Sequence, residues 1–413
     1  MRRTTATLAL TSALAAGAMV GGNVTSPAGA SLPVGPHAIT MCTAPRAGEA
    51  ACSAQRWESP AAGMAAPLAY TEGAAGTRPV GTRRTMVPAV VSGKSPSDIQ
   101  SAYKLTGISA GGRTVAIVDA YGYPNAERDL GVYRAQFGLP ACTKANGCLT
   151  IVNQSGGSAP PAFDTGWAGE QALDLDAVSA ACPSCKLLLV QATSSSFADL
   201  GPAVNTAAQR AGVAAISNSY GGSDVADATY GRFYNHPGIA VTASTGDYGY
   251  AGPAYPASSR YVTAVGGTSL VRSTSARGWA ESVWRGSGSG CSTLNVAPVG
   301  QTRANTGCSG RAIADVAAVA DPATGLAVYA PVSATASSWA QYGGTSLSAP
   351  IVAAVYALSG RTSGYANTFP YGAPSGLFDV TSGSNGSCAS FCTAKAGYDG
   401  PTGLGTPNGI SAF

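Results

Sequence analysis

Ser346 is the residue whose setting best suits covalent chemistry. It lies in Gly-Gly-Thr-Ser-Leu-Ser-Ala-Pro, residues 343–350, ahead of an apolar run at 351–358 that predicts a helix. The two glycines allow a tight turn and the close approach of a peptide backbone. A serine that opens a helix has a free backbone N–H beside it and the positive end of the helix dipole beneath it, which favours attack on a carbonyl group. The alternative is a serine that only caps the helix.

A nucleophilic serine needs a base, and histidine, the usual base, is nearly absent. The chain has two histidines. His37 falls in an N-terminal region of irregular composition, and His236 stands in an Asn-His-Pro-Gly turn ahead of a strand. A Ser-His-Asp peptidase needs an imidazole that faces the cleft. We therefore expect another group to take the proton of Ser346.

Two carboxyl groups can supply that base. The segment 167–179 predicts a helix in which Glu170 and Asp174 are one turn apart and share a face. Their proximity raises the pKa of one carboxyl and lets the pair share a proton. Such a pair can serve Ser346 at acidic pH, where an imidazole is already protonated; the alternative is an ordinary polar helix face. Asp176 points to another face, and we expect it to be solvated or to have a surface partner.

Asp247 is a candidate for stabilising an oxyanion. It follows a predicted strand at 238–243, in a turn flanked by glycines. A protonated carboxylic acid can donate a hydrogen bond if the pH is low or its site is dry. The alternative is a turn aspartate that accepts hydrogen bonds from nearby backbone N–H groups.

The elements that must position these residues predict an α/β fold. Apolar strands at 114–118, 186–190, 213–217, 238–243 and 261–265 are separated by helical patterns such as 125–137 and 198–210. Continuous apolar strands between helices indicate a mostly parallel sheet that is covered by helices on both faces. Active sites in such sheets lie outside the carboxyl ends of the strands, where the candidate residues fall.

The start of the chain and its cysteines indicate export. Arg2 and Arg3 precede an apolar run at 8–20 and a small-residue site at 28–30, so residues 1–30 predict a cleaved signal peptide. The ten cysteines fall into sequence-local pairs, which favours disulfides over a zinc site. Charged residues make up 11% of the chain and the net charge is +4, which gives no sign of nucleic-acid binding. We expect a secreted, extracellular monomer without stable membrane association.

Residues 31–93 predict a short irregular prosegment or N-terminal extension, followed by a catalytic domain over 94–413. The segment is rich in Ala, Gly, Pro and Thr and lacks periodicity. Arg83-Arg84 within it is a candidate processing site; two solvated charges are the alternative.

Together these features resemble the sedolisin, or serine-carboxyl peptidase, family of the subtilisin-like superfamily, over about residues 95–413. Further landmarks are Val115–Asp119, Ser217–Gly221, Asp315–Pro322 and Gly403-Leu-Gly. The resemblance implies a subtilisin-like fold. It implies Ser346 as nucleophile, Glu170 as general base and acid, Asp174 as its orienting partner and Asp247 as oxyanion donor. It also implies that the strand at 217–221 holds an extended substrate, and that Asp119 is a hydrogen-bond partner of the site or a strand-end cap.

The family resemblance also implies one structural Ca²⁺ in the C-terminal segment. Its ligands would come from Asp379, Val380, Lys395, Gly397 and Asp399 as carboxylates and backbone carbonyls, the hard oxygen donors that Ca²⁺ prefers. Lys395 departs from the glycine common there, so its ammonium must point away. The family usually carries a large folded prodomain, whereas only about 60 residues separate the predicted signal peptide from the catalytic region here.

The expected function is a secreted endopeptidase that hydrolyses proteins or peptides at acidic pH through a Ser-Glu-Asp triad and an acyl-enzyme. Two alternatives remain at this point. One is a subtilisin-like neutral peptidase that uses His236 and Asp119, and the other is an exported binding protein without turnover.

Overall fold

The central element is a mixed sheet of eight strands. The computed structural model describes residues 35–59, 91–388 and 390–413, and residues 36–413 form one unit. The sheet runs in the order β12, β11, β9, β7, β4, β6, β5, with β15 also paired to β11. Its strands are β4 (Thr114–Ala120), β5 (Leu149–Asn153), β6 (Lys186–Ala192), β7 (Val213–Asn218), β9 (Ala240–Ser244), β11 (Thr263–Arg272), β12 (Trp279–Val283) and β15 (Val316–Val319).

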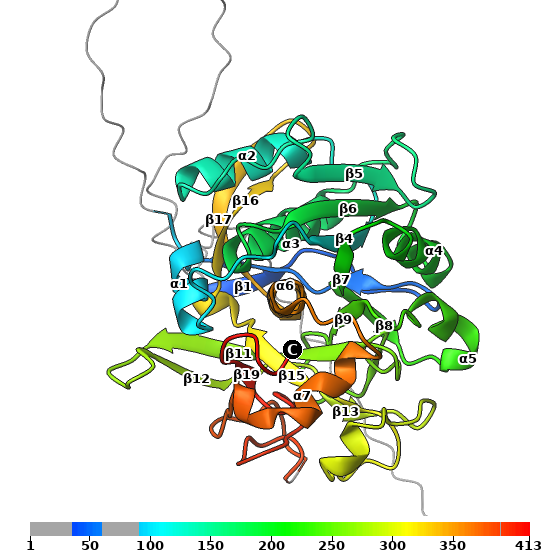
Figure 1. Ribbon diagram of the computed structural model, residues 1–413, viewed down its shortest axis with the longest axis vertical. Helices are drawn as coiled ribbons and strands as arrows, with labels where there is room; N and C mark the ends of the chain where they lie inside the picture. Colours follow the sequence, from blue (N-terminus) through cyan, green and yellow to red (C-terminus); the bar gives the residue numbers. More distant parts are fainter. Residues whose placement is uncertain (1–34, 60–90, 389) are drawn as a thin grey trace, which may run out of the picture. The chain divides into compact units, whose positions relative to one another are not determined.

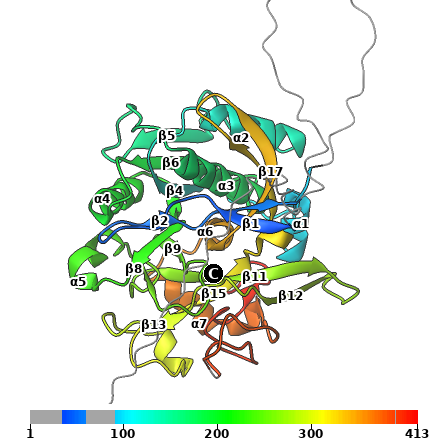
Figure 2. The ribbon, with the colours of Figure 1, turned by 180° about the vertical axis from the view of Figure 1, so that it is seen from behind.

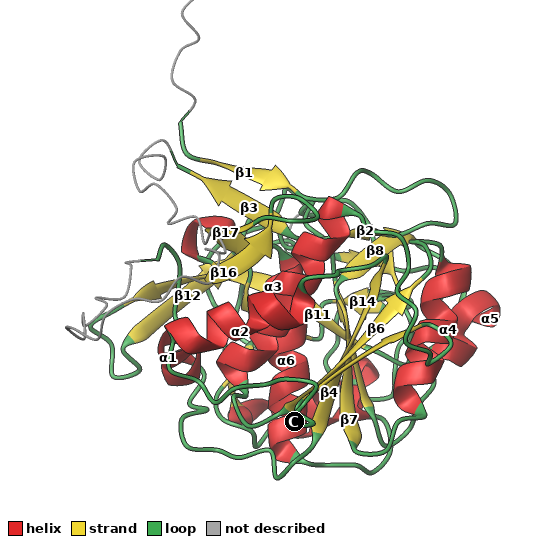
Figure 3. Ribbon diagram, turned by 90° about the horizontal axis from the view of Figure 1, so that it is seen from above, coloured by secondary structure: helices red, strands yellow, loops and turns green. Residues whose placement is uncertain are grey.

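All strand pairs in this sheet are parallel except that of β11 with β12. The apolar runs at 115–118 and 187–190 are buried on both faces, as a covered parallel sheet requires. The helices are α1 (Pro96–Ala102), α2 (Ala126–Gln136), α3 (Thr165–Ala181), α4 (Phe197–Ala208), α5 (Asp227–Tyr230), α6 (Thr345–Ser359) and α7 (Phe369–Gly372). Figure 3 shows α2, α3 and α6 on one side of the sheet and α4 on the other. The predicted α/β architecture is confirmed.

The helix α6 packs against α3 and runs through the interior (Figure 1). Every residue from Thr345 to Leu358 is buried. The helix α3 begins at the cap Asp164, whose carboxylate accepts a hydrogen bond from the Trp167 N–H at 2.9 Å. Since both helices are anchored by burial along their length, the side chains between them are held in fixed positions.

Smaller sheets surround this core, and the N-terminal segment takes part in two of them. They contain β1 (His37–Thr40), β2 (Ala51–Cys52), β3 (Gln55–Glu58), β8 (Tyr220–Ser223), β10 (Ala254–Tyr255), β13 (Gly290–Cys291), β14 (Ala312–Ile313), β16 (Leu326–Pro331), β17 (Ser337–Gly343), β18 (Leu377–Phe378) and β19 (Thr406–Pro407). One sheet has the order β1, β3, β17, β16 and another the order β10, β8, β2. Figure 2 shows β2 beside β8 on the face where β1 also lies.

The expectation of irregular structure over residues 31–93 is therefore wrong for β1, β2 and β3. Their regularity comes from pairing with β8 and β17, which sequence periodicity does not reveal. The predicted signal peptide and Arg83-Arg84 lie outside the described residues. Within the described part of the chain, no helix combines the length and the apolar character needed to cross a bilayer.

Five disulfides join the cysteines in the pairs that their proximity in the sequence suggested. They are Cys42–Cys52, Cys142–Cys148, Cys182–Cys185, Cys291–Cys308 and Cys388–Cys392. Each closes a short loop, so the bridges fix local segments and leave the joining of distant segments to the core.

A buried ion pair holds the C-terminal segment to the sheet. Arg311 donates to both carboxylate oxygens of Asp315, at 2.6 and 2.5 Å, and both side chains are fully buried. The backbone carbonyl of Asp315 accepts from the Leu404 N–H at 2.8 Å. Two such fork-like hydrogen bonds compensate the desolvation of the two charges.

We expect Arg311→Ala to destabilise the protein by about 3–5 kcal/mol, because it leaves a buried carboxylate without its cation. Urea unfolding measures this as a lower midpoint. The control is Lys144→Ala at the exposed Lys144–Glu127 pair, whose atoms are 3.2 Å apart, and it should hardly move the midpoint. Equal effects of the two substitutions would contradict the importance of the buried pair.

Candidate active site

Ser346 and the acidic pair of α3 meet where α6 begins. Ser346 lies in the first turn of α6, is fully buried and donates its hydroxyl to the Ser219 carbonyl oxygen at 3.2 Å. The same hydroxyl is close enough to Glu170 to lower the pKa of that carboxyl. Asp174 accepts a hydrogen bond from the Ser219 hydroxyl at 2.8 Å. The structure therefore brings together the serine and the two carboxyls that the sequence pattern singled out.

Burial dominates the electrostatics of this cluster. Glu170 and Asp174 are both fully buried, and loss of water raises the pKa of each well above its usual range. The negative charge of Asp119, at the end of β4, raises both values further. Burial raises the pKa of Asp119 itself to about 8. Three carboxyls in one dry site retain protons under conditions in which exposed carboxyls have lost them.

The carboxyl oxygens of Glu170 are buried without a close hydrogen-bond partner among the described residues. Among the described residues, neither oxygen of Glu170 or of Asp119 has a partner with good hydrogen-bond geometry. The Ser346 hydroxyl and the Ala54 backbone N–H approach Glu170 closely enough to favour its charged form. The Ser219 hydroxyl favours the charged form of Asp174 in the same way.

Asp247 lies on the opposite side of the α6 N-terminus. Its Oδ1 accepts from the backbone N–H and from the hydroxyl of Thr345, both at 2.8 Å. Its Oδ2 is buried and has no hydrogen-bond partner in the described chain. Burial raises the pKa of Asp247 to about 7, against the opposing effect of Thr345. Below that pH the free oxygen carries a proton that it can donate.

Gly344 permits the close approach of a peptide to this site. Its φ of +96° lies in the left-handed region that favours glycine. A Cβ at this position would collide with the Ser53 carbonyl oxygen and would lie 2.7 Å from Asp247 Oδ2. The space that glycine leaves is therefore filled by a backbone carbonyl from the N-terminal segment, next to the free oxygen of Asp247.

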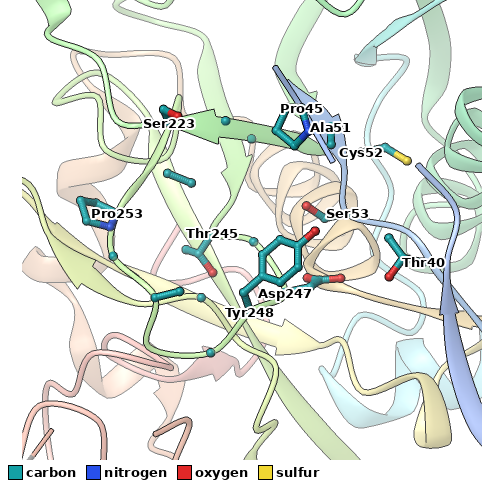
Figure 4. Close-up of a pocket in the computed structure, with 18 of the residues that line it drawn as sticks. Thr40, Pro45, Ala51, Cys52, Ser53, Ser223, Thr245, Asp247, Tyr248 and Pro253 are labelled. Atoms are coloured by element: carbon teal, nitrogen blue, oxygen red, sulfur yellow. The ribbon is translucent and has the colours of Figure 1, made fainter. Parts of the chain in front are cut away.

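A cavity of about 230 Å³ opens beside Asp247 (Figure 4). Its walls include Ser53, Gly221, Thr245 and Tyr248. The side chain of Tyr248 is 70% exposed and lies over the cavity in Figure 4. Apart from Asp247, the lining residues have no ionisable acidic or basic side chain.

Some neighbours of the site were missed or misjudged from the sequence. Asp176 is 1% exposed and accepts from the Tyr329 N–H at 3.1 Å, so the expectation that it is solvated is wrong. Ser219 contacts Asp174, and Thr345 contacts Asp247. Sequence reasoning gave neither residue a role, although Ser219 lies in the landmark segment Ser217–Gly221 and Thr345 lies in the Gly-Thr-Ser motif. The imidazole of His236 contacts its own turn, where Nε2 lies 2.9 Å from the Phe233 carbonyl oxygen. That contact gives no support to a His236 base.

Three of the five candidate calcium ligands belong to the loop 395–399, and Asp379 contacts this loop. Asp379 Oδ2 accepts from the Gly397 N–H at 2.9 Å, and Asp399 Oδ1 accepts from the Thr402 N–H at 2.9 Å. Burial raises the pKa of Asp399 to about 6, and the charge of Asp379 adds to the rise. Val380 is buried and Lys395 is exposed, so its ammonium can extend into solvent. The described residues contain no cluster of three or more Asp, Glu, His or Cys side chains suited to a metal. The donor set fits Ca²⁺ only if backbone carbonyls complete it.

Comparison with known proteins gives related sequences and folds. No family model matches the chain. It is 32% identical over 357 residues to kumamolisin from Bacillus sp. strain MN-32, covering 76% of this chain and 62% of that protein. Over 185 residues it is 37% identical to tripeptidyl-peptidase 1 of Pongo abelii, covering 38% of this chain and 32% of that protein. The chain thus spans less than two thirds of the length of either relative.

A solved structure matches the fold around the cluster. It is Pseudomonas sedolisin, a serine-carboxyl proteinase complexed with two molecules of pseudo-iodotyrostatin, with a TM-score of 0.65 and 26% identity. The match covers 77% of this chain and 96% of that one. Sequence and structure thus agree on one lineage, and the chain belongs to the sedolisin family of subtilisin-like proteins.

Proposed function

We propose that the protein is a serine-carboxyl endopeptidase that cleaves proteins or peptides at acidic pH. The observation that supports this proposal best is the convergence of Ser346, Glu170, Asp174 and Asp247 around the N-terminus of α6. The family relationship supports it independently, since Pseudomonas sedolisin is a serine-carboxyl proteinase. The predicted signal peptide and the five disulfides support secretion.

In the proposed reaction Ser346 attacks the carbonyl carbon of a peptide and its proton passes to Glu170. Asp174, one helical turn away from Glu170, would retain a proton and orient Glu170. The oxyanion forms in the space above Gly344, where Oδ2 of protonated Asp247 donates to it. Glu170 then protonates the leaving amine, and water hydrolyses the acyl-enzyme by the same route in reverse.

The peptide backbone would be held by strand pairing. In the structure β2 pairs antiparallel with β8 at Gly221, and a substrate strand that took the place of β2 would direct its carbonyl group at Ser346. The cavity beside Asp247 would receive an uncharged side chain of the substrate. Main-chain pairing gives affinity for extended peptides in general, and the cavity gives selectivity.

Replacing Ser346 by Ala or Glu170 by Gln should lower kcat/KM for a denatured protein substrate at pH 4 by at least about 10³-fold, because each removes a group that acts in the transition state. The control is Ser348→Ala. Ser348 donates to the Thr345 carbonyl oxygen within the same helix, so its loss should change the rate little. Undiminished hydrolysis by either catalytic variant, with matching circular dichroism spectra, would disprove the triad.

Asp247 should set the alkaline limit of activity. Its pKa is about 7, so it donates to the oxyanion below that pH and loses the donated proton as the pH rises through it. Asp247→Asn keeps an N–H donor at every pH, and we expect the fall in kcat/KM to move above 7. Asp247→Ala should lose about 10²–10³-fold relative to the unchanged protein below pH 7, where the carboxyl donates, and the difference should shrink above that pH. Identical alkaline limits in Asp247→Asn and the unchanged protein would assign the limit to another group.

We also propose that Asp379 and Asp399, with the carbonyls of Val380, Lys395 and Gly397, bind one structural Ca²⁺. A chelator should then lower the melting temperature of the Ser346→Ala protein, in which self-digestion is blocked. An ion bound at about 100 times its Kd contributes about 2.7 kcal/mol. Asp379→Asn should make the melting temperature insensitive to the chelator. Adding Mg²⁺ to the chelated protein should not restore its melting temperature, because Mg²⁺ demands a tighter octahedral site. Melting curves that ignore the chelator would eliminate the calcium site.

A further inference from the structure

The loop 245–250, here called the Asp247 loop, is held by main-chain contacts with the segment 284–289, here called the support segment. The Gly288 N–H donates to the Gly246 carbonyl oxygen at 2.7 Å. A Cβ on Gly288 would collide with the main chain of the Asp247 loop, so glycine lets the two backbones touch. The proposed oxyanion donor therefore lies on a loop whose position depends on a neighbouring segment.

Glycines on both sides of Asp247 leave its backbone free to move unless other segments hold it. Gly246 and Gly249 have φ values of +94° and +66°, in the left-handed region that favours glycine. The two hydrogen bonds from Thr345 both end on Oδ1 of Asp247, so they allow the carboxyl group to turn about that atom. The direction of Oδ2, the atom that would donate to the oxyanion, therefore follows from the backbone of the loop.

Asn385 joins the Asp247 loop to the support segment. The residue is 3% exposed, and its Nδ2 donates to the Ser287 carbonyl oxygen and to Ser289 Oγ, both at 2.7 Å. Its backbone carbonyl oxygen accepts from the Tyr250 N–H at 3.1 Å. A Cβ on Gly249 would lie 2.5 Å from the same oxygen, so the main chains touch there as well. One residue thus contacts the support segment with its side chain and the loop with its main chain.

Asn385 is itself fixed by the closed turn in which it lies. Its N–H donates to the Cys392 carbonyl oxygen at 3.1 Å, and the disulfide Cys388–Cys392 closes the turn. The support segment is anchored separately, because the Ser287 hydroxyl donates to the Pro401 carbonyl oxygen at 2.8 Å. Asn385 therefore connects the Asp247 loop to two anchored parts of the chain.

We propose that Asn385 is a positioning residue that directs the Asp247 carboxyl at the oxyanion formed during peptide cleavage. The inference deepens the proposed function and rests on it. Asn385 takes no part in bond making or proton transfer. It acts by keeping the loop in one conformation, so that Oδ2 of Asp247 needs no reorientation as the transition state forms.

The same contacts keep water away from Asp247. Burial raises the pKa of Asp247 to about 7. Among the described residues, Glu170 on α3 is the titratable group that interacts with Asp247 through its charge, whereas the side chains of Thr345 and Gln55 that contact it are neutral. Water that reaches the carboxyl through a loosened loop solvates its charged form, and its pKa falls. Loss of Asn385 should therefore move the alkaline limit of activity toward lower pH.

Asn385→Ala should lower kcat at pH 4 about tenfold on a quenched fluorogenic peptide that the unchanged protein cleaves, with KM nearly unchanged, because the oxyanion exists only in the transition state. Ser289→Ala removes one of the two acceptors of Asn385 Nδ2. It should lower kcat about threefold, and it tests the inference if Asn385→Ala does not fold.

Asn367→Ala is the matched control. Asn367 is 2% exposed, and its Nδ2 donates to the carbonyl oxygens of Arg260 and Val262 at 2.9 and 3.2 Å. Like Asn385, it has a buried Oδ1 without a partner in the described chain. The two alanine substitutions should therefore lower the urea midpoint by similar amounts. Asn367→Ala should leave kcat and the alkaline limit unchanged.

A double-substitution cycle shows whether Asn385 acts through Asp247. Once Asp247→Ala has removed the carboxyl, adding Asn385→Ala should change kcat by less than about twofold, because the group that Asn385 positions is gone. A further loss of about tenfold in that background would show that Asn385 acts elsewhere, and would overturn the inference.

A titration without turnover gives a second readout. In Ser346→Ala protein labelled with ¹³C at the aspartate carboxyls, NMR should show Asp247 titrating near pH 7, its signal being identified by its absence in Asp247→Asn. Adding Asn385→Ala should lower this pKa measurably, whereas adding Asn367→Ala should not.

The two readouts separate this inference from the proposed function. An active enzyme in which Asn385→Ala has the same kcat as Asn367→Ala overturns the inference and leaves the proposed function intact. Absence of hydrolysis in the unchanged protein, together with a lower Asp247 pKa in Asn385→Ala alone, overturns the proposed function and retains Asn385 as the residue that holds the loop. Absence of hydrolysis together with an unchanged titration overturns both.

Discussion

The site depends on one unfavourable arrangement: three carboxyl groups buried together between α3 and the sheet. In water Asp119, Glu170 and Asp174 would ionise separately, but their shared dry setting makes full ionisation too costly. The cluster therefore retains protons. Which of the three carboxyls carries a proton depends on the few polar groups that contact them. The Ser346 hydroxyl and the Ser219 hydroxyl are two of these groups. The acid–base chemistry that we propose at low pH would follow from this burial and would not require an imidazole.

The fold maintains this arrangement by making its supports rigid. Ser346, the proposed nucleophile, lies on a helix whose residues from Thr345 to Leu358 are buried, and Glu170 and Asp174 lie on a second helix packed against it. Asp247 reaches the first helix from the end of β9 and is tied to Thr345 by two hydrogen bonds. Because Ser346, the two carboxyls of α3 and Asp247 are carried by three different elements, their mutual geometry is set by the packing of the core.

The sequence predicted much of this and failed where pairing partners decide structure. Ser346, Glu170, Asp174 and Asp247 could be selected because motif, helix period and strand end are local signals. Asp176 was misjudged, because the spacing that separates it from Asp174 does not show that β16 covers its face. The strands at 51–52 and 55–58 were missed for a related reason. They are too short to show periodicity, and their order depends on edges supplied by residues more than a hundred positions away.

The absent side chain at Gly344 has a consequence for selectivity. The room it leaves is about that of one methyl group, and here an oxygen of the main chain takes it. Every peptide carries such an oxygen, so the tightest fit in the cleft treats all amino-acid sequences alike. Selectivity among peptides must therefore come from sites that contact substrate side chains, such as the cavity bordered by Tyr248. There the size and polarity of the side chain matter.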